Sequence, residues 1–324
     1  MLDTPLYKSY KRCQLLFLEY SKSYYLGAML FDFNTFKHIS AFYGLVRVAD
    51  NIVDGEYSIE EKRNRLTEFT DSFFELYEND LYNCDWDKYH PIMMAVFDTI
   101  SNVKIPINVF KRFFHSMTMD LETFEYSTFT DLENYMDGSA VIVGEVMLYI
   151  MANDCKFYDE KFHILHPYAR DLGIAFQLTN FIRDIKEDLE MDPSRVYIPN
   201  NILKIYDIDL HKYNKYGIID NKFRLFMKSQ IELNREIYRN AQYGINKLEP
   251  THMIAINASK ILYSSILDYI EKDDYKVFES KKIKVSFRDK LKLMYDSIPL
   301  VYLLKMMVNY VVYSYFMFVY FWLE

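Results

Sequence analysis

Four side chains that could do chemistry lie on one stripe of a helix predicted over residues 35–54. The helical pitch of about 100° per residue brings them within roughly 60° of one another: Tyr43, Arg47, Asp50 and Asp54. The positions between them are apolar, which predicts that the helix is buried nearly all round. Buried charges are unfavourable unless they are paired, bind a metal or face a water-filled cleft.

A second stretch, Leu172–Asp188, shows the same character. Its polar residues fall within about 40° of one another or on the adjoining shoulder of a helix: Gln177, Asp184 and Asp188, with Asn180 and Glu187 beside them. The residues between them are again apolar. Arg183 falls roughly 100° from this stripe on a regular helix, so geometry alone gives less support for Arg183 as a site residue.

Converging carboxylates predict a divalent cation. Four carboxylates in one cleft would repel one another and raise their pKa values unless cations neutralise them. Hard oxygen ligands favour Mg²⁺, with Mn²⁺ as an alternative, and Mg²⁺ usually completes its shell with water and substrate phosphates. Arginines beside the aspartates suit a diphosphate. One acidic pair is typical of a solvated helix face, but two pairs in apolar helices favour a magnesium–diphosphate site.

A di-iron carboxylate bundle is the competing metal site. Such bundles carry Glu-x-x-His motifs on facing helices. The acidic stretches Tyr43–Asp54 and Leu172–Asp188 contain no histidine, so magnesium is favoured.

The composition predicts an all-α globular protein. The 324 residues include 51% hydrophobic and 26% charged residues, with eight glycines and eight prolines, so long helices are favoured. A net charge of −8 argues against nucleic-acid binding. The three cysteines match no disulfide or metal spacing, and the N-terminus has no apolar secretory signal. We therefore expect an intracellular protein.

The chain is predicted to form one helical domain over residues 1–300. No stretch alternates like a strand between hairpin turns. Gly138 and Gly144 inside one helix suggest close approach of a neighbour or a ligand, and Met191–Pro199 is predicted to be an extended flap. The predicted helices cover residues 5–31, 35–54, 58–78, 91 onward, 106–124, 131–152 (capped by Asp131), 160–190, 200–207, 220–248, 251–272 and 287–323.

Residues 301–324 form a distinct apolar segment. Met306–Leu323 contains eighteen consecutive uncharged residues, just long enough to span a bilayer. A membrane anchor is the favoured interpretation, and a packed final helix is the alternative.

Motifs along most of the chain resemble the squalene/phytoene synthases, which are head-to-head prenyl transferases of the class I isoprenoid synthase fold. The resemblance covers roughly residues 15–295. The motifs that carry it are Ser21–Tyr25, Arg47–Asp54, Tyr135–Gly144, Leu172–Asp188, Arg195–Pro199, and Leu262–Leu267 with Tyr275–Phe278. The glycine segment and the Arg195–Pro199 flap look more like phytoene synthases than squalene synthases. The implied fold is one large helical bundle with a central cavity.

The resemblance implies roles for individual residues. The ligands of Mg²⁺ on two prenyl diphosphates would be Asp50, Asp54, Asp184 and Asp188, assisted by Asn180. The diphosphate contacts would be Tyr43, Arg47 and Arg183, and the further substrate contacts Ser21, Tyr24 and Tyr263. The reaction chamber would be lined by Tyr135 and Gln177. Two departures from the family pattern are Asn51, often an aspartate, and Lys281–Lys284, where arginine is usual.

The implied reaction joins two geranylgeranyl diphosphates into phytoene, through a cyclopropylcarbinyl diphosphate, in carotenoid biosynthesis. One alternative is squalene or dehydrosqualene synthase acting on farnesyl diphosphate, with NADPH needed only for squalene. Another is a non-catalytic assembly or scaffold protein of the same fold. Lipid substrates imply that the protein is close to a membrane. The prenyl chain length and the oligomeric state stay open.

Overall fold

Helices form almost all of the regular structure in the residues that the computed structural model describes: 4–78, 84–154, 158, 160–279, 283–304 and 307–309. Within these ranges, extended chain pairs in one isolated parallel bridge, between Glu125 and Val196. The all-α prediction is therefore confirmed. In chain order the elements are α1 (Pro5–Tyr20), α2 (Lys22–Ala28), α3 (Phe33–Asp54), α4 (Ile59–Glu78), η2 (Trp86–Lys88), α5 (Met93–Val103), α6 (Ile107–Met119), α7 (Phe129–Met136), the π-helix η3 (Asp137–Val141), α8 (Ile142–Asp154), α9 (Phe162–Arg183), α10 (Ile185–Leu189), α11 (Asn200–Ile205), α12 (Leu210–Tyr216), α13 (Asn221–Ile245), α14 (Pro250–Lys272) and α15 (Phe287–Ser297).

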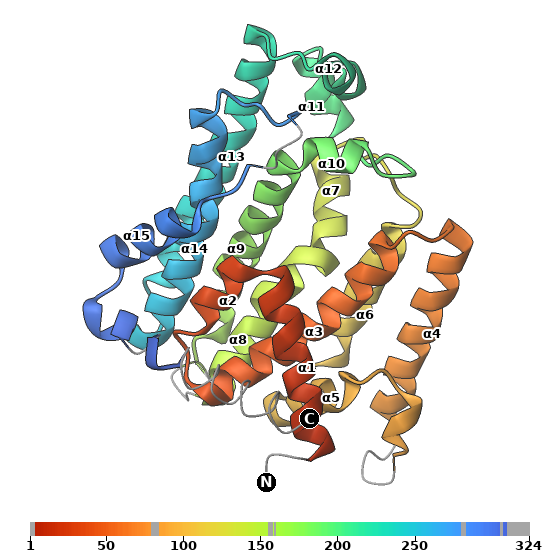
Figure 1. Ribbon diagram of the computed structural model, residues 1–324, viewed down its shortest axis with the longest axis vertical. Helices are drawn as coiled ribbons and strands as arrows, with labels where there is room; N and C mark the ends of the chain where they lie inside the picture. Colours follow the sequence, from red (N-terminus) through yellow and green to blue (C-terminus); the bar gives the residue numbers. More distant parts are fainter. Residues whose placement is uncertain are drawn as a thin grey trace.

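Two helices organise the bundle (Figure 1). α9 runs through its middle and packs against α8, α13 and α14. α3 packs against α1, α5 and α8, so that α8 contacts both organising helices. The first acidic motif, Arg47–Asp54, lies at the C-terminal end of α3. The second, Gln177–Asp188, spans the end of α9 and most of α10.

Two predicted helices break at predicted site residues. The helix predicted over 5–31 is interrupted at Ser21, whose φ of −139° and ψ of 73° separate α1 from α2. The helix predicted over 160–190 is interrupted at Asp184, with φ −99° and ψ 13°, between α9 and α10. Helical periodicity continues through both points in the sequence, so the pattern alone did not reveal the breaks.

Local capping sets where α3 and α7 begin. The Asp32 carboxylate accepts hydrogen bonds from two main-chain N–H groups of the first turn of α3, at 2.9 and 3.1 Å. Asp131 was predicted to cap the helix over residues 131–152. This prediction is wrong by three residues. Thr128 is the cap, and Asp131 completes a reciprocal capping box with it.

The glycines of the 137–154 region lie where helices approach closely, as predicted. A Cβ on Gly138 would collide with the carbonyl group of Arg112 in α6. A Cβ on Gly144 would collide with the carbonyl group of Ala169 in α9. The close neighbours are protein main chain, so these glycines serve packing in this structure.

One described stretch, Phe129–Asn153, is long and apolar enough to span a membrane by length and composition. Of its most apolar window, 61% is buried inside the protein, as in the core helix of a globular domain.

The C-terminal helix is shorter than predicted. α15 ends at Ser297, because Ile298 is extended (φ −122°, ψ 131°) before Pro299. The continuous helix predicted over 287–323 is therefore wrong at this point. Of the apolar segment 301–324, residues 305–306 and 310–324 lie outside the described residues. The Asn309 side chain donates to the main-chain carbonyls of Met29 and Phe31, at 2.8 and 3.2 Å, so the segment contacts the end of α2.

Candidate active site

The first acidic motif reaches solvent along one face of α3. Arg47 Nη2 lies 3.8 Å from Asp50 Oδ2, and the guanidinium covers the ring of Tyr20 at 4.6 Å. The side chains of Arg47, Asp50 and Asp54 are 26%, 30% and 47% exposed. The prediction of burial nearly all round is therefore wrong for this face. Hydration and pairing together offset the cost of placing these charges on an otherwise apolar helix.

Tyr43 connects this motif to the break between α1 and α2. Its ring stacks on Phe17 with centroids 4.3 Å apart. Arg47 and Ser21 lie close enough to its hydroxyl for each to lower its pKa. Burial raises the pKa of Tyr43, and the Arg47 charge opposes that rise. The structure thus brings Ser21 to the α3 stripe.

The second motif is organised by Arg183. Its guanidinium donates to both carboxylate oxygens of Asp184, at 2.6 and 2.5 Å, and to Asn180 Oδ1 at 3.1 Å. Asn180 in turn donates to Gln177 Oε1 at 3.3 Å. A regular helix would place Arg183 away from the stripe, but α9 ends at this residue. The break lets the Arg183 side chain reach Asn180 and Asp184, although the helical spacing alone gave it less support.

An aromatic wall adjoins the second motif. Tyr24 and Tyr263 stack at 4.6 Å, and Phe176 meets both rings edge-on at 5.2 and 5.1 Å. The Tyr263 hydroxyl donates to Asn180 Oδ1. Burial raises the pKa of Tyr24 well above its ordinary value. These three residues come from α2, α14 and α9, so the wall is a tertiary feature.

Arg195 joins the two acidic motifs. Its main-chain N–H donates to the Asp188 carbonyl at 2.8 Å. Its side chain donates from Nη1 to Asp54 Oδ1 at 2.9 Å and from Nη2 to the Asp120 carbonyl at 3.2 Å. The flap is non-helical as predicted, and the Val196 main-chain N–H donates a hydrogen bond to the Phe124 carbonyl at 2.8 Å. The flap therefore holds the end of α3 beside α10.

Asp120 is a buried carboxylate that sequence patterns did not single out. It accepts hydrogen bonds from the hydroxyls of Tyr135 and Tyr197, both at 3.1 Å. Burial raises the pKa of Asp120 to about 7, against the opposing charge of Arg195. Tyr135 lies in a closed cluster of rings, 5.7 Å from Tyr197 and 5.6 Å from Tyr126. Its predicted place in the chamber stays a prediction, as does that of Gln177.

The negative charges of the first motif destabilise one another. Although the Asp50 side chain is 30% exposed, desolvation by the surrounding protein is the main cause that raises its pKa to about 7. The nearby carboxylates of Asp54 and Asp120 raise it further, while Arg47 and Arg195 lower it. A divalent cation would relieve this repulsion.

Lys290 lies within electrostatic reach of Arg183 and of two further lysines. Burial lowers the pKa of Lys290, and the positive charges of Lys22, Arg183 and Lys284 lower it further. These cations come from α15, α2, α9 and the segment before α15. Such a group favours an anion of high charge, and a diphosphate fits. Lys22 lies inside a recognised motif, whereas nothing in the pattern marks Lys290.

The donor chemistry fits a hard divalent cation whose shell is completed by a ligand. Within the described ranges, no three His, Cys, Asp or Glu side chains converge closely enough to hold a metal ion. The two aspartates of each motif would therefore need oxygens from water or a diphosphate, as Mg²⁺ prefers. Arg47 Nε is buried and has no hydrogen-bond partner among the described residues. An anionic oxygen would satisfy it.

Glu-x-x-His pairs occur outside the acidic motifs, as Glu160–His163 and Glu249–His252. The Glu249 carboxylate caps α14 by accepting from the Thr251 N–H at 2.9 Å, and His252 Nδ1 pairs with the Tyr158 hydroxyl at 2.7 Å. That pair serves helix capping and packing, so it offers no di-iron site.

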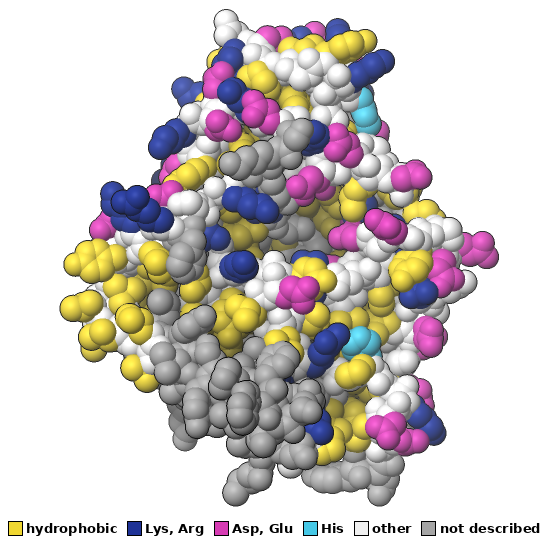
Figure 2. All heavy atoms as spheres, viewed as in Figure 1, with side chains coloured by type: hydrophobic (Ala, Val, Ile, Leu, Met, Phe, Trp, Pro, Cys, Tyr) yellow, Lys and Arg dark blue, Asp and Glu magenta, His cyan; other side chains and the backbone are white. Residues whose placement is uncertain are grey.

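The surface is hollowed between the C-terminal half of α3 and α9 (Figure 2). Hydrophobic side chains line the bottom of the hollow, and acidic and basic side chains lie around its rim (Figure 2).

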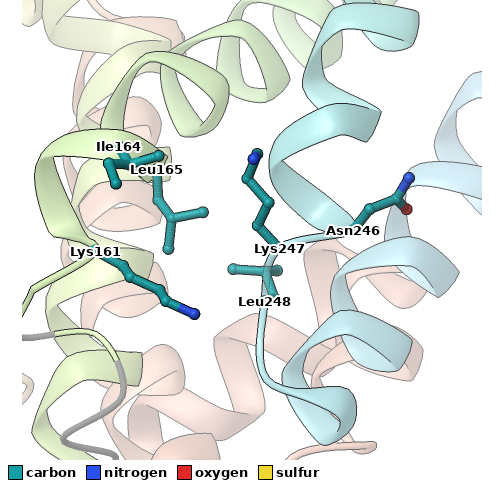
Figure 3. Close-up of a pocket in the computed structure, with 6 residues that line it drawn as sticks. All are labelled: Lys161, Ile164, Leu165, Asn246, Lys247 and Leu248. Atoms are coloured by element: carbon teal, nitrogen blue, oxygen red, sulfur yellow. The ribbon is translucent and has the colours of Figure 1, made fainter.

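A separate cavity of about 350 Å³ lies between the start of α9 and the α13–α14 connection (Figure 3). It is lined by Lys161, Ile164, Leu165, Asn246, Lys247 and Leu248, none of which was predicted to be a site residue.

The family model of squalene/phytoene synthase matches residues 18–289. This chain belongs to that family. It is 33% identical over 297 residues to the chloroplastic phytoene synthase of Daucus carota, covering 91% of this chain and 70% of the plant protein. It is 29% identical over 288 residues to the 15-cis-phytoene synthase of Synechococcus elongatus, covering 87% of this chain and 90% of the cyanobacterial one.

The fold of this squalene/phytoene synthase family member also matches solved structures. A crystal structure of a dehydrosqualene synthase in complex with ligand superposes with a TM-score of 0.72 at 19% identity. The match covers 91% of this chain and 98% of the other. The helical isoprenoid synthase fold expected from the motifs is therefore confirmed.

Proposed function

We propose that this protein is a magnesium-dependent phytoene synthase that condenses two geranylgeranyl diphosphates head to head. The observation that carries the proposal is the joining of two aspartate motifs by one residue. Arg195 binds the Asp54 carboxylate through its side chain and the Asp188 carbonyl through its main chain. The similarity to phytoene synthases of a plant and a cyanobacterium supports this product over a C30 hydrocarbon.

The aspartates would hold the metal from two sides. Asp50 and Asp54 would hold it from α3, and Asp184 and Asp188, assisted by Asn180, would hold it from the α9–α10 break. When bound, Mg²⁺ neutralises the charge of the leaving diphosphate, and Mn²⁺ would serve in the same place.

The cationic side chains would bind and orient the diphosphates. Arg47 and Arg183 each stand beside an aspartate, and the lysines near Arg183 add charge to the same end of the site. Two diphosphates, one held at each motif, would place their prenyl chains on the same side of the domain, which favours their reaction by proximity.

The apolar and aromatic side chains would exclude water from the cation that forms when an allylic diphosphate ionises. The stacked rings of Tyr24 and Tyr263, with Phe176 across them, offer faces whose quadrupoles attract a cation. Tyr135 and Gln177 are proposed to line the same chamber.

The deciding experiment incubates the purified protein with geranylgeranyl diphosphate and Mg²⁺ and identifies the hydrocarbon by mass spectrometry. We expect phytoene, formed without NADPH. A C30 product from farnesyl diphosphate, with none from geranylgeranyl diphosphate, would assign the chain to squalene or dehydrosqualene synthesis instead. No turnover of either substrate would favour an assembly or scaffold protein.

We also propose that the apolar C-terminal segment keeps the enzyme at a membrane, where its lipid substrates reside. Leu300, Val301 and Leu304 are 62%, 66% and 53% exposed, which supports an apolar docking surface at the start of this segment. Deleting residues 310–324 retains Asn309 and its contacts with α2. We expect this variant to lose flotation with lipid vesicles, and unchanged flotation would refute the proposal.

A further inference from the structure

The C-terminal segment contacts the end of α2, a helix that carries residues of the proposed site. The side-chain amide of Asn309 donates to the main-chain carbonyls of Met29 and Phe31, at 2.8 and 3.2 Å. The two residues before Asn309 are Met307 and Val308, which are 61% and 60% exposed. Asn309 therefore faces the protein while its neighbours face outward, and it reaches Met29 across 280 residues of sequence.

α2 depends on its neighbours for its stability. It has only seven residues, Lys22–Ala28, and isolated helices this short are unstable in water. On one side it packs against α14, where Gly27 lies directly against Ser259. At its C-terminal end, the carbonyls of Tyr25, Gly27 and Ala28 accept hydrogen bonds from the turn that follows. Contacts with other parts of the chain therefore decide how firmly this helix is held.

Asn309 supplies donors to carbonyls of that turn. Met29 and Phe31 are 1% and 4% exposed, so water has little access to their main-chain oxygens. A buried carbonyl without a hydrogen-bond donor is unfavourable. Removing the Asn309 amide would leave both carbonyls without the donor that the structure gives them, and this would loosen the end of α2.

α2 also forms one side of the aromatic wall. Tyr24 lies in the middle of α2, and its ring stacks on that of Tyr263 with centroids 4.6 Å apart. Phe176 meets the Tyr24 ring edge-on at 5.2 Å. Tyr24 is only about one to two helical turns from the carbonyls that Asn309 binds. A loosened end of α2 would therefore displace Tyr24 and open the wall to water.

We propose that Asn309 is a positioning residue, which caps the end of α2 from the C-terminal segment and thereby holds Tyr24 in the wall of the reaction chamber. The proposal rests on the proposed function, because it takes this wall to shield the prenyl cation from water. Asn309 acts through its hydrogen bonds to two main-chain carbonyls and not by contact with the substrate. The segment proposed to keep the enzyme at a membrane is thereby connected to the chamber.

Hydrogen–deuterium exchange of the full chain without substrate tests the capping contact independently of the reaction. Asn309→Leu removes the amide donor and keeps the segment apolar. The main-chain N–H groups of Met29, Leu30 and Phe31 should then exchange about tenfold faster or more, because the turn opens more readily. Unchanged exchange of these groups would overturn the proposal.

Asn102→Leu is the matched control. The Asn102 side chain donates to the Asp98 carbonyl at 2.7 Å within α5, so this variant removes a comparable hydrogen bond away from α2. It should leave exchange at the end of α2 unchanged. Equal acceleration in the Asn102 and Asn309 variants would show a general loss of stability and overturn the proposal.

Two truncated proteins keep the test decisive if Asn309→Leu does not fold. Deleting residues 310–324 retains Asn309, whereas deleting residues 305–324 removes it. Exchange at the end of α2 should be faster in the longer deletion than in the shorter one. Equal exchange in the two truncated proteins would overturn the proposal.

The products formed from geranylgeranyl diphosphate and Mg²⁺ test the role in the chamber. A displaced Tyr24 should let water add to the allylic cation, and loss of a proton from the added water then gives the prenyl alcohol. The ratio of alcohol to hydrocarbon should rise about threefold or more in Asn309→Leu. A general loss of stability would lower both products together, so an unchanged ratio would overturn the proposal.

The two readouts also separate this proposal from the proposed function. If the unmodified protein makes no hydrocarbon while Asn309→Leu still loosens α2, the proposed function is wrong and the role in the chamber falls with it. If the hydrocarbon forms and neither exchange nor product ratio depends on Asn309, only the role of Asn309 is refuted.

Discussion

Arg183 binds the carboxylate of its immediate neighbour, Asp184, through hydrogen bonds of 2.6 and 2.5 Å. Adjacent side chains on a regular helix point about 100° apart. The pair forms because α9 ends at Arg183 and the chain turns at Asp184 before α10. The side chains are 16% and 15% exposed, so solvent screens them little. This break gives the second motif its arginine.

Replacing Arg183 with lysine should lower kcat/KM by about tenfold or more, because an ammonium group cannot form the two parallel hydrogen bonds that a guanidinium group donates to a pair of oxygens. Steady-state kinetics with geranylgeranyl diphosphate would measure the loss. Arg235→Lys is the control, since Arg235 also binds a carboxylate twice, at Glu271 on the contact between α13 and α14. Equal losses in both variants would show that Arg183 matters only for folding.

Asp50→Asn and Asp184→Asn should each reduce kcat by at least about 100-fold, or roughly 2.7 kcal/mol in activation free energy. Each change removes a metal ligand while keeping the size of the side chain. Circular dichroism should show unchanged helix content. Full activity in both variants would contradict the assignment of the two motifs to the metal.

The metal-free protein should lose stability as the pH rises from about 4 to about 7, with Asp50 as one cause. Burial and the neighbouring carboxylates raise the pKa of Asp50 to about 7, so in this window the folded state holds a proton that the unfolded chain has released. Above about pH 7, the folded state must carry the deprotonated Asp50 carboxylate in its desolvated site, and this lowers the free energy of unfolding. Melting curves should therefore give Asp50→Asn a higher Tm than the unmodified protein at pH 8, and a smaller difference at pH 5.

Mg²⁺ should raise the Tm at pH 8 far more than at pH 5, because it must bind the deprotonated carboxylate. Asp50→Asn should lose most of this response. A Tm increase of the same size at both pH values would contradict the assignment of Asp50 as a ligand.

Gly144→Ala should destabilise the fold by about 1–3 kcal/mol, because its methyl group would collide with the Ala169 carbonyl between α8 and α9. Chemical denaturation would measure the change. Gly217→Asn is a suitable comparison: Gly217 has a φ of +59° and no neighbour within 4 Å of an added Cβ, and asparagine tolerates this backbone region. A loss as large at Gly217 would show that packing against α9 is not the cause.

Local patterns were sufficient to predict α3 and to find the two groups of charged residues. The helix predicted over 35–54 agrees with α3, Phe33–Asp54. Its helical periodicity and its end at Gly55 are both determined by residues close together in the sequence, so they can be predicted from it. The predictions failed where a short-range signal was absent or ambiguous. The break at Asp184 leaves the apolar period intact, and the cap of α7 was assigned to Asp131 because both Thr128 and Asp131 are good capping residues.

The sequence by itself determined which residues carry the charge of the site and that they repeat with the period of a helix. Helical periodicity and capping act over three or four residues, so they can be read along the chain. Only the tertiary structure decided which charges meet. Arg195 reaches Asp54 across 141 residues of sequence, and Tyr197 reaches Asp120 across 77. Such contacts depend on how α3, α6 and α9 pack, and a pattern within one helix carries no information about its neighbours.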